Sequence, residues 1–512
     1  MISQADINQL SPEQLRDTVA GLQLALQRKD QIIHNTTLLN DKLTHELAVL
    51  KRHRFGRRSE GMNPDQASLL DELVEGDIAA IEAELPEQTP VAPASTKPAQ
   101  QPRRQPLPPE LPRTLISHEP DSTECCCGCQ LVRIGEDVSE KLDYTPGEFT
   151  VERHVRGKWV CDGCETLVQA PVPAQVIDKG IPTAGLLAHV LVAKYADHLP
   201  LYRQESIFER AGYGIARSTL SDWVGRCGVA LQPLVDALRE ELVQVPILHA
   251  DETPVPMLAP GKKKTHQAYI WAYASPHQSA LQAVVYEFAP SRAGRHARAF
   301  LEGWQGKLVC DDFAGYKAGF EQGMTEIACW VHARRKFYDL HAATKSTVAA
   351  QALDSIGQLY DIEAQAKELT PRERQALRQT KAAPIIDELY SWLVEQRQKV
   401  PKGSATSKAI HYSLKRWPAL KRYLDDGNVP VDNNWVENQI RPWALGRKNW
   451  LFAGSLRSGQ RAAAVMSLIQ SAKINGHDPY AYLRDVLERL PTQKASAISE
   501  LLPHNWVPTD KV

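Results

Sequence analysis

Hydrophobic residues near the start of the chain recur at the spacing of a helix. Leu15, Val19, Leu22 and Leu26 alternate steps of four and three residues, which places their side chains on one face of an α-helix. The pattern continues imperfectly beyond them. We predict a coiled coil with a basic end over residues 1–58, through which the chain forms a homo-oligomer. Because the seam is interrupted, a helix packed on the body of the protein is the alternative.

Apolar runs rich in β-branched and aromatic residues predict five strands in the second half of the chain. One helix is expected between the third and fourth strands, and another after the fifth. The strands are predicted at residues 247–251, 269–273, 281–286, 307–311 and 326–330, and the helices at residues 295–303 and from 332 onward. Three strands, a helix, a strand ending in an acid, another strand and a helix follow the order of a ribonuclease H-like domain.

Helical periodicity is also found on both sides of these strands. Upstream, a turn at Gly212–Gly214 and a helix capped near Ser218 resemble a helix-turn-helix, for which DNA contact and plain packing both remain open. Downstream, a capping box at Thr370–Glu373 lies within residues 341–430, which we predict to be an all-helical insertion.

Composition and charge limit the classes of protein that fit. With 512 residues the chain is too long for one ordinary core, and its net charge of −1 gives no overall basic field. Residues 59–112 are acidic and then proline-rich, and the proline-rich second part predicts a linker with little fixed structure. The start lacks the pattern of a signal peptide and no apolar stretch is long enough to span a membrane, so we expect a cytoplasmic, nucleoid-associated protein.

Cysteines are concentrated in one short stretch, in two knuckles about thirty residues apart with strand-like sequence between them. This spacing predicts a structural Zn²⁺ held by four thiolates in a zinc ribbon. The predicted ligands are Cys126, Cys129, Cys161 and Cys164, with Cys125 or Cys127 as alternatives in the first knuckle.

Together these patterns predict a multidomain α/β protein with a ribonuclease H-like catalytic core, an all-helical insertion, an N-terminal coiled coil and a zinc ribbon. The predicted segments are the coiled coil (1–58), the linker (59–112), the zinc ribbon (113–175), a helical domain of the helix-turn-helix type (176–244), the first part of the core (245–340), the helical insertion (341–430), the completion of the core (431–475) and a C-terminal tail (476–512).

Three acids stand where a metal-dependent reaction would need them. Asp251 and Asp311 each end a predicted strand, and neighbouring strands of a ribonuclease H-like sheet bring such ends together. Glu437 lies near the start of a helix that we expect to begin after Asp432 and Asn433, which are good N-cap residues. Three carboxylates can hold two divalent ions for an in-line phosphoryl transfer, and Mg²⁺ (or Mn²⁺) suits such oxygen ligands. Glu252 and Asp432 are second choices.

Basic and soft side chains lie close to these acids in the sequence. Cys329 and His332 have a spacing that could bind metal, but one pair is half a site, and we interpret them as positioning residues. The residues predicted to contact DNA phosphates are Arg334, Arg335, Arg441, Arg447 and Lys448, the last two lying beyond the predicted helix.

Several longer motifs are similar to those of a known family. Besides the leucine-rich start and the cysteine knuckles, they are Phe55–Glu60, His198–Gln204, Asp251–Thr253, Asp311 with Gly315 and Tyr316, Cys329–Arg335, Asp432–Glu437 and Gly446–Ser455. On these motifs the chain resembles, over nearly its whole length, the large TnpC-type product of the insertion-sequence-66 family of DDE transposases.

The resemblance implies a function and a catalytic triad. Asp251, Asp311 and Glu437 match the metal-binding acids of the family, and Asp311 is preferred to Asp312 by its place in the motif. The implied reaction is metal-dependent DNA strand cleavage at the element ends, followed by transfer of the freed 3′-hydroxyl into target DNA. Accessory proteins of the same element are implied as further partners. The alternatives are a ribonuclease H-like nuclease without strand transfer and a catalytically dead DNA-binding regulator.

Overall fold

The computed structural model describes residues 107–508 except 110, 121–128, 146 and 260–263, and, before them, residues 23, 25–33, 35, 36, 39, 40, 42–44, 46, 47, 75–82 and 84. None of the helices in these described ranges is long and apolar enough to cross a membrane.

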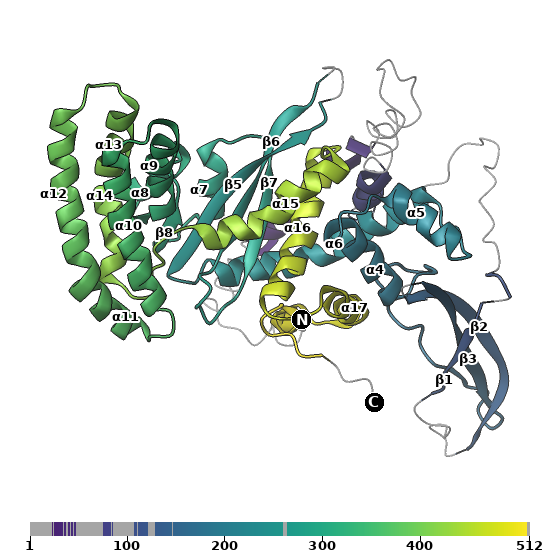
Figure 1. Cartoon of the computed structure of the whole chain (residues 1–512). Coiled ribbons are helices and arrows are strands. Elements are labelled where there is room, and N and C mark those ends of the chain that lie inside the picture. Colours follow the sequence, from purple (N-terminus) through teal and green to yellow (C-terminus); the bar gives the residue numbers. More distant parts are fainter. Residues whose placement is uncertain are drawn as a thin grey trace, which may run out of the picture.

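A mixed five-stranded sheet lies at the centre of the described chain (Figure 1). Its strands are β5 (Ile247–Met257), β6 (His266–Ala274), β7 (Val284–Ala289), β8 (Lys307–Cys310) and β9 (Thr325–Ala328). The order across the sheet is β7-β6-β5-β8-β9, in which β5, β6 and β7 are antiparallel and β5, β8 and β9 are parallel. The helices α7 (Gly294–Phe300) and α8 (Lys317–Glu321) lie in the connections that the parallel half requires. All five predicted strands and their order are confirmed.

The first strand is longer than predicted. β5 continues past Asp251 to Met257, through two prolines that argue against strand structure. The carbonyl oxygens of Pro254 and Pro256 accept hydrogen bonds from Arg447 and Ala453 rather than from β6. The proline nitrogens therefore also point away from β6, and their missing N–H groups cost no bond of the ladder.

Helices cover both faces of this sheet (Figure 1). α15 (Asn434–Trp450) packs on one face together with part of α16 (Leu456–Ile474). The opposite face packs against α6 (Arg217–Leu242) and α7. The expected helix after Asp432 and Asn433 is thus confirmed, but it runs further than predicted and includes Arg447 and Lys448.

The free edge of the sheet at β7 is closed by serine side chains. The Ser467 and Ser471 hydroxyls of α16 accept hydrogen bonds from the backbone N–H groups of Tyr286 (2.8 Å) and Val284 (3.0 Å). Ser471 Oγ also donates to the carbonyl oxygen of Val284. This helix therefore takes the place of a further strand and leaves no open edge for pairing.

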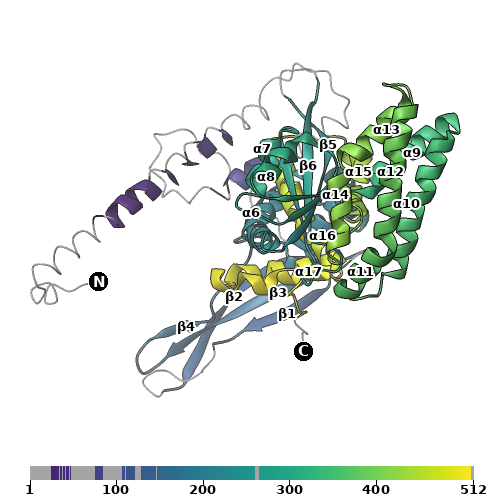
Figure 2. The same cartoon turned by 90° about the vertical axis from the view of Figure 1, so that its left-hand side faces the viewer.

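Between β9 and α15 every regular element is helical. These elements are α9 (Trp330–Thr344), α10 (Thr347–Gln365), α11 (Pro371–Leu377), the π-helical turn η2 (Arg378–Ala382), α12 (Ala383–Lys399), α13 (Ala405–Lys415), α14 (Trp417–Lys421) and the 3₁₀ turn η3 (Arg422–Asp425). They form a bundle beside the β9 side of the sheet (Figures 1 and 2). The predicted capping box is present, with Thr370 and Glu373 bonding reciprocally.

A long β-hairpin extends from the body of the protein (Figures 1 and 2). β2 (Leu131–Thr145) and β3 (Glu148–Cys161) are antiparallel, with β1 (Arg113–His118) parallel to β3 and β4 (Leu167–Gln169) antiparallel to it. The residues flanking the two cysteine knuckles lie at the same end of the hairpin, because Leu131 pairs with Cys161.

Helices α4 (Ala184–Tyr195), α5 (Leu201–Arg210) and α6 connect this hairpin to the sheet, and α17 (Pro479–Arg489) packs beside them. The predicted turn between α5 and α6 is present, with Gly212 at φ +94°. α6 begins at Arg217, one residue before the predicted cap, and it spans 26 residues. Most of its buried side chains belong to the core, which favours packing over DNA contact along its length.

The acidic part of residues 59–112 contains a packed helix. Residues 75–82 are helical, and Asp77 to Ile81 are buried. Asp77 pairs with Arg461 of α16 at 3.1 Å, and both side chains are buried. Composition could not show this packing, because the arginine partner of Asp77 lies far along the chain.

The described residues between 23 and 47 are helical and mostly exposed. Leu26, Ile32, Ile33 and Leu39 are all more than half exposed, whereas Leu43 is buried and Glu46 pairs with Arg457. The end of this helix therefore packs on the body of the protein, and the coiled coil over the rest stays a prediction.

Candidate active site

The pairing of β5 with β8 brings two of the predicted acids to one place. Ile247, Leu248 and His249 pair in parallel with Lys307, Leu308 and Val309. Two residues beyond the last pair, Asp251 is level with Asp311, and both continue the face of the sheet that carries His249 and Val309. The negative charges of Asp311 and Glu437 both act to raise the pKa of Asp251. The three predicted acids therefore share one neighbourhood.

The start of α15 is fixed to β5 by a buried asparagine. Asn433 is fully buried at the N-cap position, yet its side chain does not cap the helix. Its Oδ1 lies 2.8 Å from His249 Nδ1, and its Nδ2 donates to the carbonyl oxygen of Ala250 at 3.0 Å. These bonds set the first turn of α15, which carries Glu437, against the strand segment that leads to Asp251. The sequence analysis missed this role, although a polar histidine within an apolar strand is a signal that could have indicated it.

The two positioning residues predicted from sequence lie beside Glu437. Cys329 Sγ accepts a hydrogen bond from the Asn433 backbone N–H at 3.2 Å, and burial raises the pKa of its thiol to about 12. His332 Nε2 lies 3.7 Å from Glu437 Oε1, and burial lowers the pKa of His332. At neutral pH the pair is thus a neutral thiol and a neutral imidazole.

Two buried atoms at this site have no hydrogen-bond partner among the described residues. They are Glu437 Oε1 and His332 Nδ1. An unsatisfied buried polar atom costs about 1–3 kcal/mol, and a bound cation would offset that cost at the carboxylate. The residues present thus fit a metal ion.

Among the described residues, the side chains whose ligand atoms lie near enough to share one metal ion are not those of the predicted triad. Ligand atoms of Cys329, His332 and Glu437 lie within 4.8 Å of one another, and no group that includes Asp251 and Asp311 meets that separation among the described residues. Burial, then the charges of Glu252, Glu437 and Asp311, raise the pKa of Asp251 well above its usual range.

The second-choice acids have other partners. The Glu252 side chain is buried, receives hydrogen bonds from Arg292 (Nε, 2.7 Å) and Tyr316 (3.2 Å), and follows Asp251, so it points to the other face of β5. Asp432 accepts from Tyr360 at 3.0 Å and from the Asn434 N–H at 3.0 Å.

An arginine from the helical bundle holds the loop that carries Asp311. Arg416 is buried and bonds Glu326 at 2.6 Å and the Asp311 carbonyl oxygen at 3.0 Å. Its Nε also lies 3.7 Å from Asp312. Arg416 is therefore structural and lies beside Asp312, while the Asp311 carboxylate accepts a hydrogen bond from the Phe313 backbone N–H at 2.9 Å. Local sequence could not show this contact, because Arg416 lies more than a hundred residues from Asp311.

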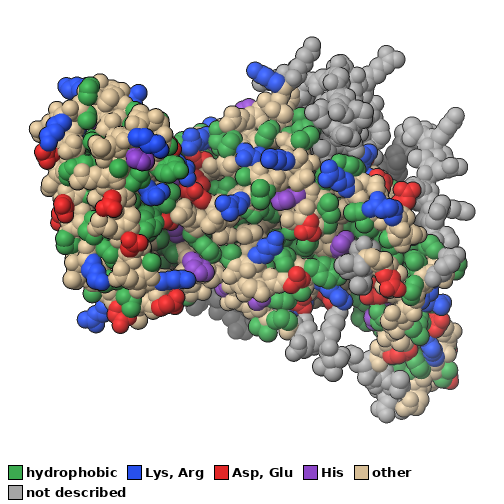
Figure 3. All heavy atoms as spheres, in the orientation of Figure 1, with side chains coloured by type: hydrophobic (Ala, Val, Ile, Leu, Met, Phe, Trp, Pro, Cys, Tyr) green, Lys and Arg blue, Asp and Glu red, His purple; other side chains and the backbone are tan. Residues whose placement is uncertain are grey.

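Most of the predicted DNA-contacting residues are exposed. Arg334 and Arg335 are on α9, and Arg441 and Lys448 are on α15. Arg447 is partly buried and donates to the Pro254 carbonyl oxygen at 2.7 Å. Basic side chains are spread over the face shown in Figure 3.

Two described cysteines of the predicted zinc ribbon lie near one another, although the ligand atoms of Cys129, Cys161 and Cys164 do not all come within 4.8 Å of one another. A Cβ placed on Gly163, within the second knuckle, would lie 3.0 Å from Cys129 Sγ and 3.8 Å from Cys161 Sγ. Cys164 Sγ lies 3.1 Å from Thr166 Oγ1 in the same turn. Cys125, Cys126 and Cys127 lie outside the described residues, so the choice of the remaining ligand stays a prediction.

Comparison with known families gives four matches along the chain. "Transposase IS66 family" matches residues 179–461, and "IS66 C-terminal element" matches residues 467–504. "Transposase C of IS166 homeodomain" matches residues 42–116, and "zinc-finger binding domain of transposase IS66" matches residues 123–165. The last match supports a zinc-binding element.

Similar proteins occur in Sinorhizobium fredii (strain NBRC 101917 / NGR234). Uncharacterized protein y4qI is 38% identical over 484 residues, which is 91% of this chain and 89% of that protein. Uncharacterized protein y4jD is 38% identical over 487 residues, 91% of this chain and 94% of that protein. Uncharacterized protein y4hP is 35% identical over 489 residues, 90% of this chain and 88% of that protein.

Proposed function

The chain belongs to the IS66 transposase family, and on that premise we propose that it cleaves DNA strands at the ends of its element and joins the freed 3′-hydroxyl to target DNA. The observation that carries this proposal is that three acids lie on one face of the sheet. Asp251 is on β5, Asp311 follows the neighbouring strand β8, and Glu437 is in the first turn of α15.

The proposed fold of the catalytic core is ribonuclease H-like. Its support is the strand order β7-β6-β5-β8-β9, with three antiparallel strands followed by two parallel ones. A helix that brings a third acid then follows the sheet in sequence, here after an insertion of helices. The insertion supports the core through the bonds of Arg416 to Glu326 and to the Asp311 carbonyl oxygen.

In this proposal the three acids are the ligands of Mg²⁺ (or Mn²⁺). Bound divalent ions would lower the pKa of an attacking water or hydroxyl and stabilise charge on the phosphate in flight. Burial and the neighbouring carboxylates raise the pKa of Asp251, so positive charge nearby would favour its ionised form. Asn433 and His249 fix the helix that carries Glu437, while Cys329 and His332 position the Glu437 carboxylate from α9.

The partners follow from the same proposal. Exposed Arg334, Arg335, Arg441 and Lys448, together with Arg447, bind the phosphates of the element end and of the target. The described cysteines Cys129, Cys161 and Cys164, with Cys126 or a neighbouring cysteine, hold a structural Zn²⁺. The N-terminal helix mediates homo-oligomerisation, and accessory proteins of the same element are further candidates.

The test is metal-dependent cleavage and joining of a labelled duplex that carries the element end. Glu437→Gln removes a ligand charge at nearly constant volume. Glu395→Gln on α12 is the matched control, since Glu395 is exposed and, among the described residues, forms its ion pair with Lys399. We expect the parent and Glu395→Gln to cleave and join, and Glu437→Gln to lose both activities. Cleavage without joining by the parent would indicate the nuclease alternative, and activity retained in Glu437→Gln would refute the triad.

A further inference from the structure

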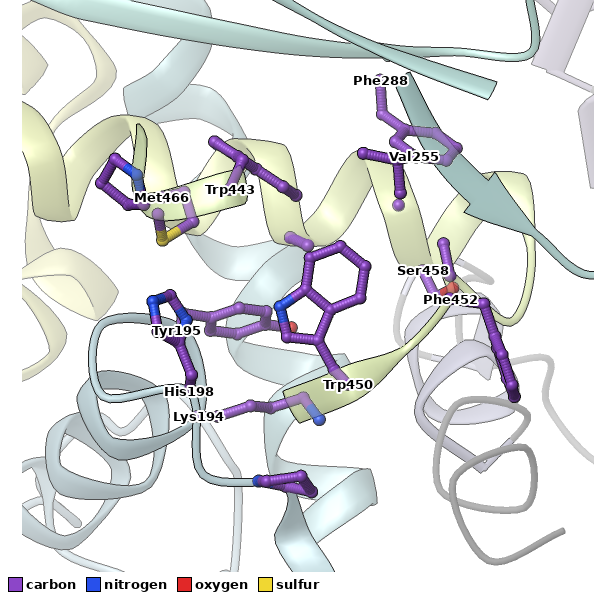
Figure 4. Close-up of a pocket in the computed structure, with 15 residues that line it drawn as sticks. Lys194, Tyr195, His198, Val255, Phe288, Trp443, Trp450, Phe452, Ser458 and Met466 are labelled. Atoms are coloured by element: carbon purple, nitrogen blue, oxygen red, sulfur yellow. The ribbon is translucent and has the colours of Figure 1, made fainter. Parts of the chain in front are cut away.

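An aromatic cavity lies on the far part of α15, away from the acids. It has a volume of about 70 Å³ and lies between α15, α16, β5, β7 and the end of α4. None of the three predicted catalytic acids lines it. Figure 4 shows the Trp450 indole near the centre, with Tyr195 and His198 on one side and Phe452 on the other.

The lining contains an unsatisfied polar atom. Trp443 is buried, lines the cavity and meets Trp450 edge to face, with ring centroids 6.2 Å apart. Its buried indole Nε1 has no hydrogen-bond partner among the described residues. A buried indole N–H normally finds an acceptor, so the packing around this aromatic pair is not fully satisfied.

The backbone on both sides of the cavity is in an unusual conformation. His198 and Leu451 have φ values of +58° and +62°, in the left-handed region that residues other than glycine rarely adopt. A Cβ on Gly446 would lie 2.5 Å from Trp450 Nε1 and 2.7 Å from His198 Nδ1, so only glycine leaves room for both rings. Such strain is retained where surrounding structure requires it and is common at ligand sites.

We propose that this cavity binds a single nucleobase that is extruded from the DNA near the cleaved end. The occupant is a flat ring that stacks on Trp450. Base stacking on aromatic side chains needs no sequence readout, because every base has a π face. The cavity holds several times the ~10–15 Å³ that one water needs, which suits one ring entering edge-on and excludes a helix or strand of another protein.

The position along α15 connects this cavity to the proposed reaction, on which the inference rests. Trp443 and Trp450 follow Glu437 by 6 and 13 residues on the same helix, which is roughly 9 to 20 Å along its axis. That distance corresponds to about three to six base pairs of duplex. Lys194 lines the cavity, and Arg447 and Lys448 lie on α15 just before Trp450, so phosphates flanking an extruded base would meet positive charge.

The test uses a duplex with the terminal sequence that flanks the coding region. Permanganate oxidises unstacked thymines, and 2-aminopurine placed at successive positions reports unstacking of other bases by its fluorescence. With the full-length parent we expect one unstacked position within about six base pairs of the cleavage site. Trp450→Ala should abolish that signal and weaken end binding about tenfold, while Leu445→Ala, an exposed residue of the same helix, should leave both unchanged.

Two further variants of the chain make the result unambiguous. Glu437→Gln should lose cleavage but keep the unstacked base, which separates failure of this inference from failure of the proposed reaction. Trp450→Phe should restore most of the signal, which a merely structural loss would not predict. A parent complex with every base stacked, or an unstacked base that persists in Trp450→Ala, would overturn the proposal; the second result would leave the cavity to a side chain of a partner protein.

Discussion

Replacing Asn433 by alanine should disable the site without touching any of the three acids. The side chain is fully buried and makes two bonds to β5, one with His249 Nδ1 at 2.8 Å and one to the Ala250 carbonyl oxygen at 3.0 Å. Alanine leaves both partners buried and unsatisfied, at about 1–3 kcal/mol each. We therefore expect a loss of about 3 kcal/mol in the free energy of unfolding of the core.

Thermal unfolding and cleavage kinetics measure the two consequences. If the core melts as a unit of about 150–250 residues, its transition should fall by about 6–12 °C. Cleavage at a temperature where the variant is folded should fall by about 100-fold, because a displacement near 1 Å of the Glu437 helix is enough for such a loss. The DNA affinity should change little, since Asn433 is inaccessible to DNA.

The adjacent asparagine provides the control. Asn434 is exposed and bonds only to Asp432 nearby, so Asn434→Ala should change stability by a few tenths of a kcal/mol. A double-mutant cycle of Asn433→Ala with His249→Ala should give a coupling of about 1–2 kcal/mol. If Asn433→Ala melts and cleaves like Asn434→Ala, the argument that this side chain holds α15 on β5 is refuted.

Three further predictions concern charge, pH and zinc. Asp251→Asn should raise the melting temperature by a few degrees at pH 7.5 in Mg²⁺-free buffer, because the raised pKa of Asp251 means that its buried charge opposes folding. The same variant should lose cleavage. A lower melting temperature would contradict this prediction. Burial lowers the pKa of His249 to about 4, so its contribution to stability is full above about pH 6.5 and falls as the pH decreases toward 4, by about 2 kcal/mol at pH 5. The melting temperature of His249→Gln should therefore depend less on pH than that of the parent. Equal changes of melting temperature with pH in the two proteins would count against this prediction. Cys161→Ser should lose the one bound zinc per chain, measured by elemental analysis, whereas Cys329→Ser should retain it, and zinc retained in Cys161→Ser would exclude that ligand.

Local patterns in the sequence were enough to predict the framework of the core. Strand-forming runs, the acid after the fourth strand and the helix that begins after Asn433 were all read from short stretches. They could be predicted because alternation, caps and apolar runs are properties of neighbouring residues. The proximity of Asp251 and Asp311 also followed, because parallel neighbouring strands end at the same edge of a sheet.

What the sequence did not show depends on contacts between distant parts of the chain. Asn433 was expected to cap its own helix, but its side chain bonds β5 instead. No local pattern indicated that Arg416 bonds the Glu326 carboxylate and the Asp311 carbonyl oxygen of the core. The packing of the acidic segment around Asp77 could not be predicted either, because its partner, Arg461, lies on α16. In each case the deciding interaction is tertiary, and composition or periodicity cannot reveal it.

The central claim is that Asp251, Asp311 and Glu437 hold the same metal ions, and iron-directed cleavage of the polypeptide tests it most directly. Fe²⁺ can replace Mg²⁺ at oxygen-ligand sites, and with ascorbate and peroxide it produces radicals that cut the chain beside the bound ion. We predict three sets of fragments, with ends near residues 251, 311 and 437, that disappear together in excess Mg²⁺ and in Glu437→Gln. Fragments confined to the neighbourhood of Cys329 and His332, or cuts near Asp251 and Asp311 that persist in Glu437→Gln, would contradict the account.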